Sequence, residues 1–577
     1  MINANKQKLQ AFFQGNLQFE IPFFQRAYVW SDDNWNIFWD HLIGEVEAYE
    51  KGIQSEHFIG TIITKQKENK NLSENIVELI DGQQRLTTIT VFLKALADTS
   101  KGDLPNLKES IETLLWFKDS YSKKHYRMIH SRIDKPNFHQ IMESPEKLED
   151  TDNSSIVMAY KYFIEKLESF TDQQRETTKQ VLLHKIPIIS MLLDKDDDEQ
   201  EIFDTINSLG VRLTIAELLK NYLFKDKELI EYYEEEWQSV FENDEEQVEF
   251  WSTVRSSGRV KRDNIELLLY CMLIIETKKE VRLEKLFSEY KIHLKKMGLE
   301  EKKQFLLRLN DLATLYLEMP QKEELVEFGF NDQEKRFFHL LQSLEITTIM
   351  PLVLYLINNI SNNDELKHCF KILESFIALR QICKFTTKNY NNLFIQIIRS
   401  LDKKKAEKDL ESNDLLEILN SFNDFGNKIP NKVEVQEAFH SCVLSNNQAG
   451  AILYTIALKD IHSEYSDTKT LSSKSFSVEH IMPKKWEENW SKNDLDELSK
   501  FKRKQKLLTI GNLTLITKNL NSKLRNQSWE KKKETLKEYS SLKMTTSFLE
   551  FEKWDEESIS DRANQLCDKA LEIWNID

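Results

Sequence analysis

Four residues near the carboxyl end have the types and spacing that phosphodiester hydrolysis requires. Glu479 and His480 lie in the run 476–483, Asn512 lies at the start of a second apolar run, and Asn521 follows nine residues later. A neutral imidazole can take a proton from water near pH 7, and a divalent cation can neutralise charge on a phosphorane and on its leaving oxygen. Mg²⁺ and Mn²⁺ prefer oxygen ligands, such as a carboxylate and an amide carbonyl.

These preferences assign a role to each residue. We expect His480 to be the general base, with Glu479 and Asn521 as ligands of Mg²⁺ or Mn²⁺. Asn512 completes the catalytic set by bracing the loop that carries the histidine. Adjacent residues of a regular strand point to opposite faces, so Glu479 and His480 share a site only if the strand breaks, which Pro483 favours. The alternative is a buried histidine beside a surface glutamate, with the asparagines in turns.

A strand-to-helix turn in the first hundred residues has the groups that bind an anion. Runs 59–64 and 76–80 are short and β-branched, which predicts strands, and 84–97 has apolar residues on one side, which predicts a helix. Backbone N–H groups at the helix start attract phosphate, Arg85 adds a forked donor, and Gly82 lets a ligand approach the backbone. The sequence contains no GxxxxGK[ST] pattern, which excludes an ordinary P-loop.

Aromatic residues crowd a polar pair in the segment 21–30. Gln25 and Arg26 are followed closely by Tyr28 and Trp30. Stacking and cation–π contacts suit such residues to recognition of a base, a nucleotide or a backbone phosphate, so we expect DNA sensing here. The alternative is an aromatic core with a surface arginine.

Composition narrows the class of protein. A chain of 577 residues exceeds one hydrophobic core. The net charge of −16 argues against a large non-specific nucleic-acid coat but permits a local basic cleft. The basic cluster 500–506 and the lysines 531–533 are candidate phosphate contacts, with a solvated helix face as the alternative. Dispersed cysteines without a CxxC pair favour a reduced, cytoplasmic protein, and no apolar run suggests a membrane span.

Scarce glycine and proline, with abundant Lys, Glu and Leu, predict a mainly α fold with small β elements, an α+β protein. We expect 155–225 to be helical, with Thr214 and Glu217 forming a capping box. Two strand-like runs, 474–481 and 507–516, precede a lysine-rich helix. The expected domains are 1–225, a helical connecting domain 226–434 without recognisable chemistry, and 435–577.

The C-terminal motifs resemble the HNH nuclease superfamily, in particular the C-terminal HNH-like domain of GmrSD-type restriction enzymes. The resemblance rests on 479–483, 511–515, Asn521, Lys531 and Lys532. It implies a ββα-metal fold within a helical surround. In that family the residue before the histidine is acidic and the last metal ligand is often asparagine, as here.

The N-terminal motifs resemble the N-terminal domain of the same enzymes, which is related to the ParB/sulfiredoxin-like fold. The matching segments are 22–30, 80–88 and 203–221, where Glu217 replaces the commoner aspartate. The resemblance implies binding and hydrolysis of a nucleoside triphosphate of unspecified identity, with Asp81, Gln84 and Arg85 as catalytic residues. It also implies sensing of modified DNA, as in the phosphorothioate-sensing SspE nickases. The implied nucleotide-binding residues are Arg26, Asp81, Gly82, Gln83, Gln84, Arg85, Thr87, Asn207, Lys220 and Asn221.

Together the two ends imply an NTP-regulated, metal-dependent endonuclease or nickase of bacterial phage defence, acting on modified DNA in the manner of type IV restriction. The expected partners are modified phage DNA and an NTP, with no membrane. The sequence leaves the oligomeric state undecided, with a homodimer as one option. Two other functions stay open: an NTP-dependent DNA-binding regulator with an inactive HNH domain, and an abortive-infection nuclease toxin.

Overall fold

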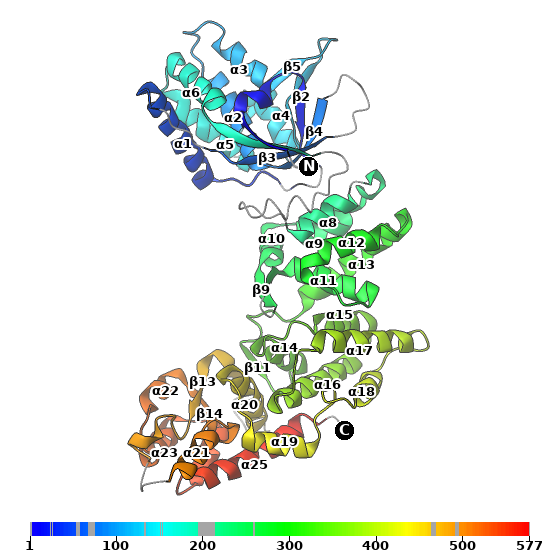
Figure 1. Ribbon diagram of the computed structural model, residues 1–577, viewed down its shortest axis with the longest axis vertical. Coiled ribbons are helices and arrows are strands. Elements are labelled where there is room, and N and C mark those ends of the chain that lie inside the picture. The colour runs from blue at the N-terminus through cyan, green and yellow to red at the C-terminus, as the bar shows by residue number, and fades with distance from the viewer. Residues whose placement is uncertain are drawn as a thin grey trace. The chain divides into compact units, whose positions relative to one another are not determined.

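The protein forms two compact units, Met1–Lys225 and Asp226–Asp577, in a computed structural model (Figure 1). Helices make up most of the described chain, as expected. The boundary expected at 434/435 falls inside a helix, α19 (Lys432–Ser441). No helix in the described parts of the chain is long and apolar enough to cross a membrane. The described residues are 3–22, 25, 27–53, 58–66, 75–131, 134–149, 152, 154–193, 214–224, 226–257, 260–462, 469–490 and 496–575.

A mixed six-stranded sheet is the framework of the first unit. It is larger than the small β elements expected, and the expectation that 155–225 is helical was wrong at β8, which pairs antiparallel with β1 and parallel with β3. The apolar, β-branched run after Pro187 suits a strand covered by two neighbours. In sheet order the strands are β1 (Asn3–Lys8), β8 (Pro187–Leu193), β3 (Thr61–Gln66), β4 (Asn75–Asp81), β2 (Leu17–Glu20) and β7 (Met128–Ile129).

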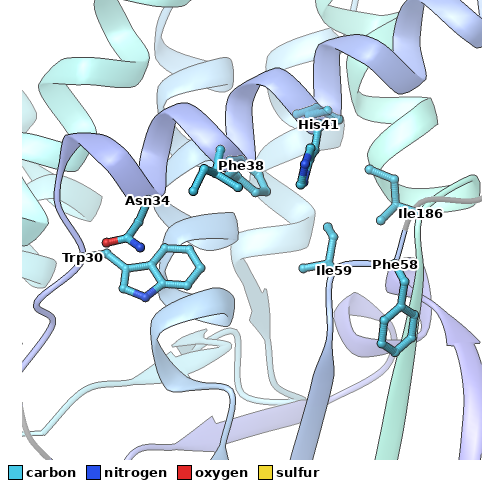
Figure 2. Close-up of a pocket in the computed structure, with 9 residues that line it drawn as sticks. Trp30, Asn34, Phe38, His41, Phe58, Ile59 and Ile186 are labelled. Atoms are coloured by element: carbon cyan, nitrogen blue, oxygen red, sulfur yellow. The ribbon is translucent and has the colours of Figure 1, made fainter. Parts of the chain in front are cut away.

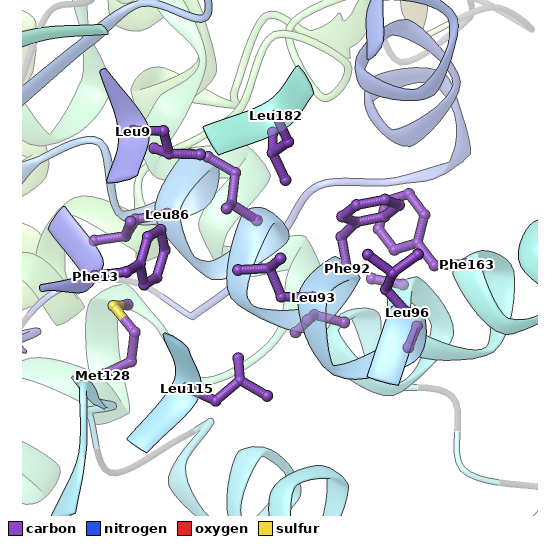
Figure 3. Packing of buried hydrophobic residues seen from close by; sticks show 14 of the residues in the cluster. Leu9, Phe13, Leu86, Phe92, Leu93, Leu96, Leu115, Met128, Phe163 and Leu182 are labelled. Atoms are coloured by element: carbon purple, nitrogen blue, oxygen red, sulfur yellow. The ribbon is translucent and has the colours of Figure 1, made fainter. Parts of the chain in front are cut away.

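Helix α2 (Gln83–Asp98) is the central element of the first unit's core (Figure 3). It is buried on nearly all sides, as expected of a helix enclosed by other elements. Phe92 meets Phe163 edge to face, with ring centroids 5.3 Å apart. The predicted capping box is confirmed, because Glu217 N–H donates to the Thr214 hydroxyl and the Glu217 carboxylate accepts from Thr214 N–H. The other helices described are α1 (Asp32–Glu50), α3 (Leu107–Leu115), α4 (Lys135–Glu143), α5 (Ser155–Glu168), α6 (Asp172–His184) and α8 (Ile215–Leu223).

The second unit begins with packed helices, as the amphipathic pattern predicts. A short hairpin of β9 (Val254–Ser257) and β10 (Val260–Asp263) interrupts them, and β11 (Glu327–Gly329) pairs with β12 (Thr470–Ser472). The helices are α9 (Ser239–Phe241), α10 (Glu245–Ser252), α11 (Asn264–Thr277), α12 (Leu286–Leu294), α13 (Leu299–Glu318), α14 (Gln333–Ser343), α15 (Met350–Asn359), α16 (Asn363–Ile382), α17 (Tyr390–Lys405), α18 (Ser412–Asn420), α19 and α20 (Asn446–Ile461).

Two antiparallel strands followed by a helix lie at the centre of the C-terminal part. Strand β13 (Phe476–His480) pairs with β14 (Leu513–Thr517), and α22 (Lys518–Leu524) follows directly. Strand β14 starts later than expected because residues 510–512 form a 3-10 turn. The predicted lysine-rich helix is confirmed as α23. The remaining helices are α21 (Glu497–Lys506), α23 (Trp529–Tyr539), α24 (Lys543–Thr546) and α25 (Glu556–Ile573).

Candidate functional site

Strand β13 carries both Glu479 and His480. Its pairing with β14 is regular through the last residue, His480, so the strand break that a shared Glu479–His480 site requires does not occur between them, and the two side chains leave opposite faces of the strand. The Glu479 carboxylate accepts a 2.5 Å hydrogen bond from Lys532 Nζ, and that ammonium also donates to the backbone oxygen of His480 at 2.9 Å. The contacts described therefore join the two residues through Lys532, which meets the side chain of one and the main chain of the other.

Asn521 of α22 lies against the same strand. Its Nδ2 donates to Ser477 Oγ at 2.9 Å and to Val478 O at 3.2 Å. Ser477 precedes Glu479 by two residues, so the two side chains share a strand face. With the amide nitrogen engaged, the amide oxygen of Asn521 is the atom that can face a cation.

The donor set suits a hard divalent ion. One carboxylate, from Glu479, and one amide oxygen, from Asn521, match Mg²⁺ or Mn²⁺, which complete their shells with water. No group of three or more His, Cys, Asp or Glu in the described chain could hold a metal, which leaves no zinc-type cluster there. The sequence-based ligand set therefore fits the kind of ion expected, and its role stays a prediction.

His480 is half-buried, and this position affects its protonation. Desolvation, helped by the charges of Lys484 and Lys532, lowers the pKa of His480 to about 4. Burial also shifts the pKa values of Glu479 upward and of Lys532 downward, while their mutual attraction opposes both shifts. The imidazole is thus neutral near pH 7, the form that a general base needs.

Asn512 holds the loop that follows His480. Its Oδ1 accepts from Met482 N–H at 2.9 Å and from Trp554 Nε1 at 3.0 Å, and its Nδ2 donates to Met482 O and Leu507 O. All four hydrogen bonds are inside the protein, which makes this side chain a fixed brace rather than a group facing substrate.

Cationic groups near this centre differ in availability. In the cluster 500–506, Arg503 is paired with Glu556, and Lys506 donates to His440 O. Lys531 of α23 instead lines a polar hollow of about 350 Å³, together with Arg525 and four other polar residues. Of the candidate phosphate contacts in α23, Lys531 is the one exposed to solvent beside a cavity.

The turn between β4 and α2 forms a second polar centre, in the first unit. Gly82 adopts φ +97° between strand and helix, and a Cβ there would meet Ile62 and the Thr61 carbonyl at 3.0–3.1 Å. Arg85 donates to Thr61 O at 2.7 Å and pairs with Asp81 at 3.1 Å. Asp81 and Arg85 both keep partial exposure at this turn, so a phosphate could reach them.

Gln84 ties this turn to the aromatic segment. Its Oε1 accepts from the N–H groups of Val29 and Trp30, and its Nε2 donates to Ala27 O. Its side chain thus serves the fold, so a catalytic role for Gln84 would require these bonds to open.

Two residues expected to sense DNA are engaged inside the first unit. Tyr28 is 2% exposed, and its hydroxyl bonds Thr88 and Trp35. The side chain of Gln25 donates to Leu79 O. The Tyr28 hydroxyl and the Gln25 amide nitrogen are therefore both engaged by the protein in this arrangement.

Trp30 faces a largely apolar hollow of about 230 Å³ (Figure 2). Asn34, Phe38 and His41 of α1 form one side of it, and Phe58 and Ile59 lie across from them. Two consecutive residues of α2 contact the segments that line this hollow. Gln84 accepts from the N–H of Trp30, and Arg85 lies against Gly60, the residue after Ile59.

Two regions of this chain match the two domains of the GmrSD restriction enzymes. Residues 9–224 match the GmrSD restriction endonuclease N-terminal domain, and residues 430–569 match the GmrSD restriction endonucleases C-terminal domain. The chain belongs to the GmrSD restriction endonuclease family. No curated protein matches it. Membership implies a nuclease that cleaves DNA in restriction.

Other residues of the GmrSD N-terminal motifs lie deeper or outside the described chain. Thr87 is fully buried, with Oγ1 3.5 Å from His130 Nε2, and Gln83 is also buried. Lys220 and Asn221 lie buried in α8. Nucleotide binding by these four stays a prediction that requires the observed packing to open. Arg26 and Asn207 lie outside the described residues.

The residue that sequence reasoning undervalued in this GmrSD protein is Lys532. The sequence predicts a phosphate contact for this lysine, with a solvated helix face as the alternative, and the structure shows neither, because the side chain is buried. A signal existed, because Trp529, Lys532 and Leu536 follow helical spacing, which places the lysine on the apolar side of α23.

Proposed function

We propose that this GmrSD family member is an NTP-regulated, metal-dependent endonuclease or nickase that acts on modified DNA in phage defence. The observation that carries the nuclease part is the ββα element itself, in which half-buried His480 ends β13 and Asn521 of the following helix hydrogen-bonds the same strand. The oxygen donors Glu479 and Asn521 support the metal dependence, and the braced loop at Asn512 supports a fixed geometry.

The chemistry assigned to His480 is removal of a proton from water as that water attacks phosphorus. The bond from phosphorus to the 3′ oxygen breaks, the departing oxygen takes up a proton, and the product ends are a 5′-phosphate and a 3′-hydroxyl. A bound divalent cation would supply charge neutralisation at the phosphate and the departing oxygen. Lys531 and Arg525, at the polar hollow, are suited to hold the DNA backbone by its phosphates.

In the first unit, we assign nucleotide binding to the turn at Asp81, Gly82 and Arg85. A helix start, a left-handed glycine and a partly exposed guanidinium are suited to phosphate oxygens. Trp30, at the apolar hollow, is the described aromatic residue best placed to meet a base or its modification. A ParB/sulfiredoxin-like assignment of this unit and an HNH assignment of the ββα element belong to the same proposal. The helices of 226–434 would connect the two activities.

The decisive experiment compares cleavage of modified phage DNA with the same DNA unmodified, with Mg²⁺ or Mn²⁺ and each NTP in turn. His480→Ala should abolish cleavage and spare NTP hydrolysis, whereas Arg85→Ala should impair NTP hydrolysis first. Normal cleavage by His480→Ala would refute the site. Metal-independent DNA binding without cleavage would instead identify a regulator, and toxicity without phage that His480→Ala removes would identify an abortive-infection toxin.

A further inference from the structure

Lys532 occupies a position in α23 where the packing calls for an apolar side chain. Trp529 and Leu536, three residues before and four after it, both belong to the hydrophobic cluster of this part of the chain. Lys532 itself is 0% exposed. A buried ammonium is costly unless partners satisfy it, so its partners indicate what it does.

The ammonium has two described partners, and both lie on β13, at the candidate catalytic centre. Nζ contacts Glu479 Oε1 and the His480 carbonyl oxygen. Its neighbours behave differently, because Lys531 is exposed and Lys533 donates to Phe551 O. Among these three consecutive lysines, the described contacts bring only Lys532 to the carboxylate.

We propose that Lys532 is a positioning residue that acts as the built-in counter-cation of the catalytic centre. It holds the Glu479 carboxylate and the end of β13 in place before a divalent ion binds, and it lowers the affinity for that ion by competing for the same carboxylate. The inference rests on the proposed function, since it takes Glu479 as a metal ligand.

Charge decides the direction of the effect. The ammonium occupies Oε1, so a divalent ion must bind Oε2 beside it or displace it from Oε1. In either case two positive charges share one carboxylate in a poorly hydrated site, where repulsion is far stronger than in bulk water. Removal of the charge should therefore strengthen metal binding by more than the lost positioning weakens it.

The test is Mn²⁺ binding to the full chain without DNA, measured by calorimetry or electron paramagnetic resonance. Lys532→Met keeps the apolar packing, and Lys532→Gln keeps a hydrogen-bond donor without the charge. Both should bind Mn²⁺ about tenfold tighter or more than the unmodified protein. Lys537→Met is the matched control, because it removes an exposed charge from the same helix and should leave the affinity unchanged.

Each pattern of results has one meaning. Affinity in both Lys532 variants equal to or weaker than in the unmodified protein overturns the inference, because removal of a cation that competes for the carboxylate must tighten Mn²⁺ binding. Glu479→Gln should weaken Mn²⁺ binding strongly. If Glu479→Gln binds Mn²⁺ as the unmodified protein does, the proposed metal site itself is wrong and the inference is lost with it.

Discussion

The side chain of Asn512 hydrogen-bonds both polar groups of Met482, accepting from its N–H and donating to its carbonyl at 2.8–2.9 Å. Met482 lies two residues after His480, so this pairing fixes the chain as it leaves β13. A second connection reinforces the first, because Ile481 N–H donates to the Asn512 carbonyl. The proposed general base, His480, is thereby followed by a loop that a fully engaged side chain holds in place.

Replacement of Asn512 by aspartate should preserve the shape of the side chain but remove the hydrogen bonds that its amide nitrogen donates. A carboxylate cannot donate to Met482 O and Leu507 O, and it would bury a charge against two carbonyl oxygens. We expect the free energy of unfolding to fall by roughly 3 kcal/mol or more, with loss of DNA cleavage. Denaturant unfolding and a nicking assay measure the two effects. Asn423→Asp, at an exposed turn, is the control and should change stability by about 0.5 kcal/mol at most. Equal unfolding midpoints for both variants would contradict the brace.

Gln84→Leu should loosen the aromatic segment of the first unit. The change removes acceptors from Val29 N–H and Trp30 N–H and a donor from Ala27 O, so we expect a loss of about 2–3 kcal/mol of stability. The specific signature is faster amide hydrogen exchange at Val29 and Trp30. The exposed Gln173→Leu change serves as the control. Unchanged exchange at both amides would mean that Gln84 does not hold this segment in solution.

Local patterns predicted much of the fold that positions both centres. The β-branched run of β4 and the apolar spacing of α2 predicted the first turn, and Thr214 with Glu217 predicted the start of α8. The polar sequence of β1 has no alternating pattern, so long-range pairing with β8, rather than propensity, forms it. The run of β8 is apolar and β-branched, but it lies within a stretch that the sequence predicted to be helical.

At the candidate catalytic centre, too, the sequence predicted the local element but not the long-range contacts. The order of Glu479, His480, Asn512 and Asn521 along the chain predicted which residues belong to one ββα element. It did not predict that Glu479 would lie in a buried ion pair with a residue 53 positions away. Lysine is most often solvated, and only the tertiary packing of α23 places this one inside.

The rate of DNA cleavage should fall on the acid side only at unusually low pH. An ordinary histidine is mostly protonated below pH 6.5. The pKa of His480 is lowered to about 4, so its imidazole stays neutral from about pH 6.5 down to about pH 5 and can still accept a proton there. We therefore expect kcat/KM to hold from about pH 8 to about pH 5 and then to fall. Lys484→Met removes a charge that lowers this pKa, so its acid limb should shift to higher pH. A wild-type limb centred near pH 6.5 would contradict the burial of the imidazole.

Gly511 should tolerate no side chain, because α25 packs directly on its backbone. A Cβ at this position would lie 2.3 Å from the Ile559 carbonyl oxygen and 3.0 Å from Ala563 Cβ. Since the first of these is backbone, the helix must move, and Gly511→Ala should cost roughly 2–4 kcal/mol of stability and displace Asn512. Gly450→Ala is the matched control in α20, where the added methyl meets only Val478 at 3.5 Å and should be neutral or stabilise by up to about 1 kcal/mol. Thermal unfolding compares them, and equal midpoints would show that α25 does not pack on Gly511.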